Sequence, residues 1–251
     1  MNKIGFKESR ISEKHYFEWR KNRAQSAVNR ISGNYELKNK VTLDIGCGYG
    51  ALSSILLSKG AKVYATETDK SKLDSAEKLI KGNKKNIKYL HVKNEILPFK
   101  DKFFEVIFLF DVIEHVKKPE IMIEECERIL KPEGLLYVEF TPYYSITGHH
   151  LYDYTKLPIH ALPKSLIKKI VFSKKAKSFM TQEYYWEQFE SLNKLRIEKF
   201  QKMVEKDFIK VNERFIIKYP ELFEINLGFI NYFGFFKDYL TMSYEGLFKK
   251  T

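Results

Sequence analysis

The feature of the sequence that most constrains the fold is a short apolar run followed by alternating glycines. Val41 to Ile45 is apolar and β-branched in character, which predicts a buried strand. Gly46, Gly48 and Gly50 follow at every second position, and residues 51–59 have the apolar spacing of a helix. Glycine lets a ligand approach bare main chain, and a helix N-terminus offers unpaired N–H groups. The segment therefore predicts a nucleotide-binding βα unit.

Two carboxylates narrow the choice of nucleotide. Asp44 ends the first predicted strand, where it would repel a pyrophosphate but would suit a ligand that carries an ammonium group. Glu67 ends the next predicted strand, 62–66, about 20 residues beyond the first glycine, where nucleotide folds place a carboxylate on the ribose hydroxyls. NADP is disfavoured, because its 2′-phosphate would meet this acid, whereas NAD stays open. The sequence has no Gly-Lys-Ser/Thr, which excludes a P-loop.

The rest of the chain alternates between predicted strands and helices. Further strands are predicted at 87–92, 105–110, 135–140, 208–218 and 240–249. Helices are predicted within 1–40 and at 69–79, 119–130, 163–177, 181–204 and 220–232. This order predicts an α/β protein with a doubly wound, seven-stranded, mostly parallel sheet.

Five segments together resemble one family. Leu43-Asp-Ile-Gly-Cys-Gly-Tyr-Gly50 is similar to motif I of the class I S-adenosylmethionine (SAM) methyltransferases. The segments 63–76, 94–99, 111–116 and 130–135 resemble, in the correct order, the family's ribose segment, its Leu-Pro-Phe loop, its Glu-His segment and its Leu-Lys-Pro turn. The resemblance covers residues 41–141. It implies a Rossmann-like SAM-binding domain over 41–251, preceded by a helical lid at 1–40 and carrying an inserted acceptor cap at 142–180.

The resemblance also implies a cofactor and the residues that bind it. SAM would be the methyl donor and S-adenosylhomocysteine the product. Asp44 and the first glycines would hold the methionine part, Glu67 the ribose, and Asp111 would lie beside the methionine part or the methyl group. Lys93 stands where the family has an adenine-contacting Asp, so Asn94 or Glu95 would replace it. The full predicted cofactor set is Asp44, Gly46, Cys47, Gly48, Gly50, Glu67, Thr68, Asn94, Glu95, Ile96, Asp111, Val112 and His115.

The predicted cap supplies the candidate catalytic residues. The segment 143–154, directly after the strand at 135–140, is rich in tyrosine and contains His149, His150 and Asp153. We expect one of these histidines to be a base that Asp153 orients. The alternative is that the loop histidines only shape the acceptor pocket. The spacing of Cys, His and acidic residues matches no standard metal site, so no metal is predicted.

The charge of the chain leaves several partners open. The formal net charge is +12, from 44 Lys and Arg against 32 Asp and Glu. Such an excess of positive charge attracts RNA or an anionic membrane surface. The alternative is that the lysines only keep the surface of the protein hydrated. Residues 164–177 carry lysines and no acid, which fits either a membrane-surface helix or a solvated helix of the cap. No Asp/Asn-Pro-Pro-Tyr follows the strand at 105–110, which disfavours methylation of DNA bases.

The cysteines and the termini favour a cytoplasmic protein. Cys47 and Cys126 fall in a loop and a helix and are expected to be free thiols in a reducing compartment. The start of the chain is polar, unlike a secretion signal, and no apolar stretch has the length of about 20 residues that spans a bilayer.

The leading functional prediction is methyl transfer from SAM to O or N of a small-molecule, sugar or lipid-precursor acceptor. The alternatives are an RNA methyltransferase, a non-catalytic SAM-fold interaction protein and an NAD-linked oxidoreductase. The oligomeric state is not predicted.

Overall fold

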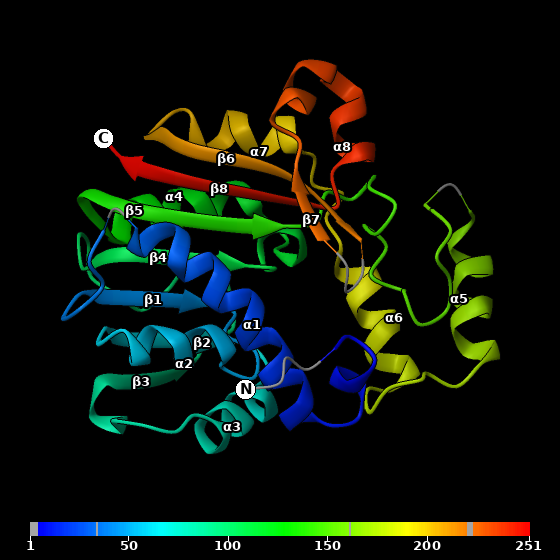
Figure 1. Cartoon of the computed structure of the whole chain (residues 1–251), viewed down its shortest axis with the longest axis horizontal. Coiled ribbons are helices and arrows are strands. Elements are labelled where there is room, and N and C mark those ends of the chain that lie inside the picture. The colour runs from blue at the N-terminus through cyan, green and yellow to red at the C-terminus, as the bar shows by residue number, and fades with distance from the viewer. Residues whose placement is uncertain (1–4, 34, 161, 220–222) are drawn as a thin grey trace.

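A single twisted sheet forms the centre of the molecule (Figure 1). The computed structural model describes residues 5–33, 35–160, 162–219 and 223–251. In these ranges the sheet has eight strands in the order β3-β2-β1-β4-β5-β8-β6-β7. The strands are β1 Val41–Ile45, β2 Lys62–Glu67, β3 Ile87–His91, β4 Phe104–Phe110, β5 Leu130–Phe140, β6 Phe208–Tyr219, β7 Phe223–Asn226 and β8 Ser243–Lys250.

Helices flank the sheet on both faces. The α-helices are α1 Glu13–Ser32, α2 Ala51–Ser58, α3 Lys70–Leu79, α4 Pro119–Ile129, α5 Lys164–Ser173, α6 Gln182–Ser191, α7 Ile197–Val204 and α8 Lys237–Leu240. The short 3-10 segments are η1 Glu8–Arg10, η2 Lys84–Asn86, η3 Ile113–His115 and η4 Gly228–Phe236. Among the described residues, none of these helices combines the length and apolarity that crossing a membrane requires.

The strand directions confirm the predicted doubly wound α/β fold. The first five strands run parallel to one another, and β8 is antiparallel to both β5 and β6. The prediction of seven strands was one short, because β7 pairs antiparallel with β6. This strand lies in the stretch 220–232 that was predicted to be helical, of which residues 220–222 lie outside the described part. Its remainder is β7 and the start of η4.

Alternation along the strands divides the core between two faces. Leu43 and Ile45 of β1 point to the face covered by α4 and α7, as does Ile107 of β4. Val106 and Phe108 of β4 point to the opposite face, which α1, α2 and α3 cover. Neighbouring side chains of a strand point to opposite faces, so a continuous apolar run such as β4 is buried on both sides. Both cysteines are free, as predicted, and both are buried.

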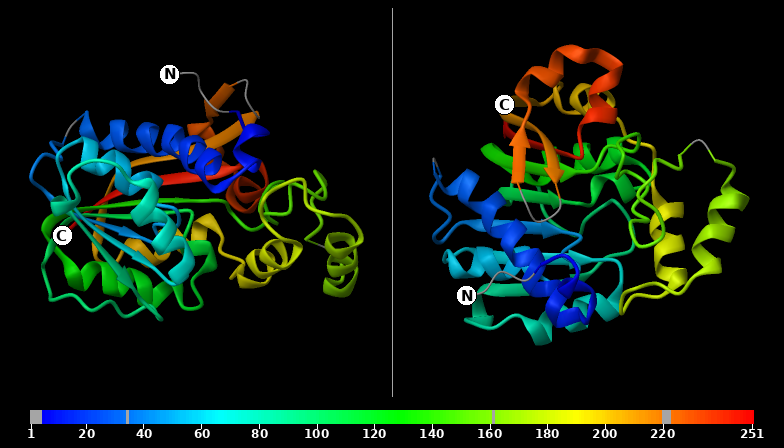
Figure 2. Two further views of the ribbon diagram at one scale, coloured as in Figure 1. Left: turned by 90° about the horizontal axis from the view of Figure 1, so that it is seen from below. Right: turned by 45° about the vertical axis from the view of Figure 1, so that its right-hand side comes forward.

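Helix α1 crosses the sheet on one face (Figure 2). Its N-terminal half, from Tyr16 to Arg23, lines the predicted ligand site. Ser12 caps its N-terminus by accepting a hydrogen bond from the main chain of His15. Ala24, Val28 and Ile31 form its buried stripe, at the spacing of an amphipathic helix. Small residues in that stripe allow close approach to α2, which lies alongside.

The segment after β5 folds over the carboxyl ends of the parallel strands (Figure 1). It has its own apolar cluster, in which Leu151 and Ile167 of the predicted cap pack with Tyr185 and Phe189 of α6. The helix predicted at 181–204 is two helices, α6 and α7. The chain between them leaves the helical conformation because Asn193 hydrogen-bonds the main chain around η3, where its Nδ2 donates to two carbonyl oxygens at 2.8 Å.

Candidate active site

A cavity of 730 Å³ lies at the carboxyl edge of the parallel strands, between the glycine loop, α1 and the cap. Open α/β sheets bind their ligands at this edge. The lining comes from segments far apart in the sequence: residues 44–52 and 66–68, the loop 92–97, the turn 110–117, helix α1 and the cap. The geometry of each part indicates what it can bind.

The glycine loop brings bare main chain to the cavity. Gly46 and Gly48 have φ of +64° and +54°, a region that other residues rarely adopt. A Cβ on Gly46 would lie 2.7 Å from Val112, so this glycine is needed for packing. A Cβ on Gly48 would meet no atom within 4 Å, because that side of the main chain faces open space. Helix α2 starts directly afterwards, with no side chain capping its N-terminus. A ligand can therefore approach Gly48 closely.

Asp44 lies on the floor of the cavity. Its side chain is 1% exposed, and its Oδ2 accepts a hydrogen bond from Ser53 Oγ at 2.6 Å. Burial raises the pKa of this carboxyl to about 7, against the opposing effect of the Ser53 hydrogen bond. A buried carboxylate is stabilised by a nearby positive charge. The position therefore suits a ligand with an ammonium group, as predicted from the sequence.

Glu67 ties the glycine loop to the end of β2. Its Oε2 accepts a hydrogen bond from the Gly48 N–H at 2.8 Å. Its Oε1 accepts from the N–H groups of Thr68 and Asp69 at 2.7 and 3.1 Å. Three main-chain donors fix the carboxylate at the wall of the cavity. A carboxylate held in this way can also accept hydrogen bonds from the hydroxyl groups of a ribose.

Asp111 is the meeting point of the sheet and α1. It has φ of +56°, rare for a residue other than glycine, and its N–H donates to the Glu139 carbonyl at 2.8 Å. Its carboxylate accepts from Arg20 and, at 2.8 and 3.3 Å, from the two Nη atoms of Arg23. Burial acts to raise the pKa of Asp111, but the two arginines hold it well below its usual range.

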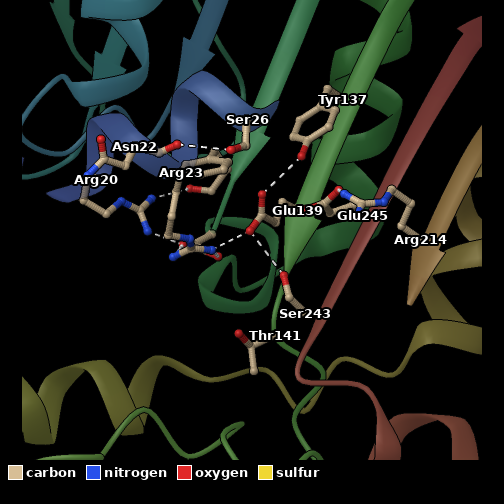
Figure 3. A network of polar contacts seen from close by, with 12 residues as sticks. Arg20, Asn22, Arg23, Ser26, Tyr137, Glu139, Thr141, Arg214, Ser243 and Glu245 are labelled. Atoms are coloured by element: carbon tan, nitrogen blue, oxygen red, sulfur yellow. Dashed lines mark hydrogen bonds and ion pairs between the residues drawn. The ribbon is translucent and has the colours of Figure 1, made fainter. Parts of the chain in front are cut away.

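The ion pairs continue across the sheet beneath α1 (Figure 3). Arg23 also reaches the carboxylate of Glu139 on β5, which accepts a hydrogen bond from Tyr137 at 3.1 Å. Farther along, Arg30 of α1 pairs with Glu245 of β8. Helix α1 is thus fixed to the sheet by arginines at its cavity end and along its length.

The other end of the cavity carries histidine and tyrosine side chains. His115 and His150 have ring centroids 5.0 Å apart, and Tyr152 lies beside them. Burial lowers the pKa of His115 to about 4 and that of His150 to about 3. Both imidazoles are therefore neutral at pH 7.

His149 and Asp153 lie elsewhere. His149 is fully buried, and its Nδ1 accepts from the Leu151 N–H at 3.0 Å. It is absent from the cavity lining among the described residues. The carboxylate of Asp153 pairs with Arg10 and accepts from the Tyr185 hydroxyl. The predicted orientation of a histidine base by Asp153 is therefore wrong, because other partners occupy that carboxylate.

Comparison with known proteins agrees with this geometry. Residues 43–138 match the family model of the methyltransferase domain. The chain is 36% identical over 107 residues to the ubiquinone biosynthesis O-methyltransferase of Coxiella burnetii, a match that covers 43% of this chain and 46% of the relative. The chain thus matches about half the length of that curated relative.

Solved structures match over nearly the whole chain. A SAM-dependent methyltransferase from Thermotoga maritima has a TM-score of 0.60 at 17% identity, covering 98% of this chain and 99% of its own. The magnesium protoporphyrin IX methyltransferase of Synechocystis, solved with bound S-adenosylhomocysteine, has a TM-score of 0.58 at 15% identity, covering 100% and 90%. Residues 43–138 thus match a methyltransferase domain, and the chain has the fold of the SAM-dependent methyltransferases.

Most of the predicted cofactor set lines the cavity of the methyltransferase domain. The lining residues are Asp44, Gly46, Cys47, Gly48, Glu67, Thr68, Asn94, Glu95, Asp111, Val112 and His115. Two members lie elsewhere. Gly50 packs against Ile80, and Ile96 points outward with 66% of its surface exposed. Of the predicted catalytic residues, His150 lines the cavity.

The residues present fit the cofactor of the family. The cavity offers a buried carboxylate for the amino group, main chain free of side chains at Gly48 and a fixed carboxylate at Glu67 for the ribose. Sequence reasoning predicted a helical lid at 1–40 but assigned no site residue to α1, because Tyr16, Trp19 and the two arginines reach the cavity only through tertiary packing. The aromatic and basic character of these side chains was the one feature of the sequence that could have indicated their place in the site.

Proposed function

We propose that this chain catalyses methyl transfer from SAM to a small-molecule acceptor. One observation carries the proposal: a single cavity contains both the groups suited to the cofactor, Asp44, Gly48 and Glu67, and an end with neutral imidazole and phenol side chains. The second end gives an acceptor a place beside the methyl group.

The chemistry divides between cofactor and chain. When bound, SAM supplies a methyl group that is already activated on a sulfonium. The chain must then align the acceptor and keep water out, and a hydroxyl acceptor must also lose its proton. His150 is the side chain that we place against the nucleophilic atom. Its Nε2 is buried and has no hydrogen-bond partner among the described residues, and the ring is neutral at pH 7.

A hydroxylated aromatic compound is the acceptor class that we propose to test first. Aromatic side chains line the cavity from two sides, Tyr16 and Trp19 from α1, Tyr152 from the cap and Tyr184 from α6. Such walls favour a planar ring, which stacks on them. The curated relatives carry the name ubiquinone biosynthesis O-methyltransferase, which also points to a hydroxyl group. The match to the family model, residues 43–138, ends before the cap, so the acceptor is inferred from the cavity itself.

We also propose that residues 1–40 act as a lid and 142–180 as an acceptor cap. Helix α1 contacts the cavity through Arg20 and Arg23, and both arginines hold Asp111. A lid of this kind excludes water from the site when it is in place.

Transfer of labelled methyl groups tests the proposal. Purified protein is incubated with methyl-labelled SAM and an extract of the organism that encodes it, and label is counted in small-molecule, lipid, RNA and protein fractions. We expect label in the small-molecule or lipid fraction. Binding of S-adenosylhomocysteine is measured separately. Binding without label in any fraction would mean that the extract lacks the acceptor, and a panel of phenols and catechols then replaces it. Absence of both would overturn the proposal and favour an interaction protein.

The His150 assignment has a matched control on the same loop. His150→Ala should reduce turnover strongly, because the residue contacts the acceptor, and should leave the affinity for S-adenosylhomocysteine nearly unchanged. His160→Ala changes a histidine that lies outside the cavity lining, where its ring packs on Tyr143, and should retain turnover. Equal turnover in both variants would remove His150 from the reaction.

The second candidate for the acceptor is RNA or a membrane-bound lipid, because the cap carries a basic segment. Residues 156–182 contain seven lysines and no acid. If the acceptor is RNA, its affinity falls steeply with salt. The exposed Leu166 and Phe172 beside these lysines favour an anionic membrane as the source of a lipid acceptor. Sedimentation with anionic vesicles and filter binding of RNA, each at two salt concentrations, separate these cases.

A further inference from the structure

We infer that Glu114, His115 and His150 form a binding site for a divalent transition-metal ion at the acceptor end of the cavity. Each residue offers one ligand atom, and these atoms all lie within 4.8 Å of one another. Two of the residues come from the turn after β4, and the third comes from the loop after β5. Metal binding itself is independent of the proposed function, whereas its role in catalysis depends on that function.

The carboxylate of Glu114 lacks a complete set of partners. The residue is 1% exposed, and its Oε1 accepts a hydrogen bond of 3.4 Å from the Thr141 N–H. Its Oε2 is buried and has no hydrogen-bond partner in the part of the chain that the structure describes. Leaving such an oxygen unsatisfied is costly. A bound cation would satisfy it.

His150 is aimed at the same point under backbone strain. It has φ of +56°, and its N–H donates to the Thr147 carbonyl at 3.2 Å. Its Nε2 is buried and unpartnered within the described residues. A left-handed conformation at a residue other than glycine persists where the surroundings enforce it, and such positions cluster at functional sites. The strained loop thus presents a free nitrogen beside the free carboxylate oxygen.

His115 has the second contact that metal-binding histidines usually have. Its Nδ1 lies 2.7 Å from Ser191 Oγ, at the end of α6. A hydrogen bond at one ring nitrogen fixes the orientation of the imidazole and leaves the other nitrogen for the ion. Ser191 is therefore a positioning residue for this site.

The donor set selects the kind of ion. Two imidazoles and one carboxylate suit zinc and neighbouring transition metals, whereas magnesium and calcium prefer oxygen ligands. Three protein ligands leave a position open, and both histidines line the cavity. A hydroxyl group of the acceptor can occupy that position. The ion would lower the pKa of the hydroxyl, so that the hydroxyl gives its proton to solvent. Its oxygen would then form a bond to the methyl carbon of SAM as the bond from sulfur to that carbon breaks, which releases S-adenosylhomocysteine. His150 then acts through the ion.

Titration of metal-free protein with zinc tests the site directly. Protein treated with chelator and dialysed is titrated with Zn²⁺ by calorimetry, and Co²⁺ serves as an absorbing probe of imidazole ligation. We expect one ion per chain. His115→Ala and His150→Ala should each weaken binding at least 100-fold, and Ser191→Ala should weaken it about 10-fold. His160→Ala, a neighbouring histidine outside the cluster, should bind as the native protein does.

A thermal unfolding transition close to that of the native protein shows that each variant is folded. Zinc affinity unchanged in both histidine variants, or no binding by the native protein, would overturn the inference and leave the proposed function standing. The catalytic role is read from methyl transfer with and without chelator. Transfer that persists at full rate in chelator would overturn that role, and restoration of lost transfer by added Zn²⁺ would support it.

Discussion

Arg23 of α1 holds Asp111 with two hydrogen bonds, Nη1 to Oδ2 at 2.8 Å and Nη2 to Oδ1 at 3.3 Å. The same guanidinium reaches Glu139 on the neighbouring strand. One side chain thus bridges the partly buried carboxylate of Asp111 and the buried carboxylate of Glu139. It also fixes a helix that lies 88 residues earlier in the chain than Asp111. The pairing explains why α1 stays at the edge of the cavity.

Removal of this side chain should destabilise the fold. Arg23→Ala leaves Glu139, which is 1% exposed, with one cation fewer, so we expect a loss of about 3 kcal/mol in the free energy of unfolding. Arg23→Lys should recover only part of it, because an ammonium cannot form the forked contact. Lys21→Ala, which removes a pair with Glu18 on the same helix, should cost below about 1 kcal/mol. Equal losses for Arg23→Ala and Lys21→Ala in urea unfolding would contradict this account.

The central βα units were predictable because their signals are local. The strand, glycine turn and helix from Val41 to Ser58 lie within one continuous segment, and the structure has them where they were predicted. The position of Glu67 was predictable for the same reason. One helix and two turns fix the distance along the sequence from the glycine loop to the end of the next strand.

The contacts that complete the site were not predictable, because they join distant segments. The Arg23–Asp111 pair and the His115–His150 contact depend on how α1 and the cap pack, and no short-range pattern encodes that. The predicted helix at 181–204 failed for the same reason. Asn193 gains main-chain hydrogen bonds at η3 only in the folded protein, and these contacts override a helical pattern in the sequence.

Replacement of Gly48 should weaken ligand binding more than it lowers the stability of the fold. Gly48→Ala places a methyl group in the open space over the loop and forces alanine into φ of +54°, which costs about 1 kcal/mol in stability. Gly82→Ala is the control, since Gly82 also has positive φ and open surroundings but lies outside the cavity. Gly82 has φ of +125°, which alanine adopts less readily than +54°, so we expect a loss of stability in Gly82→Ala at least as large as in Gly48→Ala. Affinity for S-adenosylhomocysteine should fall in Gly48→Ala alone. Full affinity in Gly48→Ala, measured by calorimetry, would rule out a close approach of the ligand.

Glu67 should hold the loop and the ligand together. Glu67→Gln puts an amide where the carboxylate now accepts three N–H groups, so one amide nitrogen must face a donor. We expect at least a tenfold loss of affinity for S-adenosylhomocysteine. Asp69→Asn is the neighbouring control, because Asp69 caps α3 and asparagine caps equally well. Comparable affinity in the two variants would exclude Glu67 from the ligand site.

The pKa of Asp44 predicts how ligand binding depends on pH. Burial holds this carboxyl at a pKa of about 7 in the free protein, and a bound ammonium group favours its ionised form. Binding should therefore release a proton below pH 7, and affinity for S-adenosylhomocysteine should rise by up to about tenfold per pH unit until it levels off above pH 7. Calorimetry in two buffers that differ in ionisation enthalpy measures the proton release.

The same residue predicts the pH dependence of stability with the opposite sign. The pKa of Asp44 is higher in the folded protein than the value of about 3.9 in an unfolded chain. The folded state therefore binds more protons between these values, and the contribution of Asp44 to stability is complete at low pH and is lost as the pH rises through 7. Asp44→Asn should abolish both effects, giving weak binding that is independent of pH and a flatter stability profile from pH 5 to 8. Proton release that persists in Asp44→Asn would assign the titration to another group.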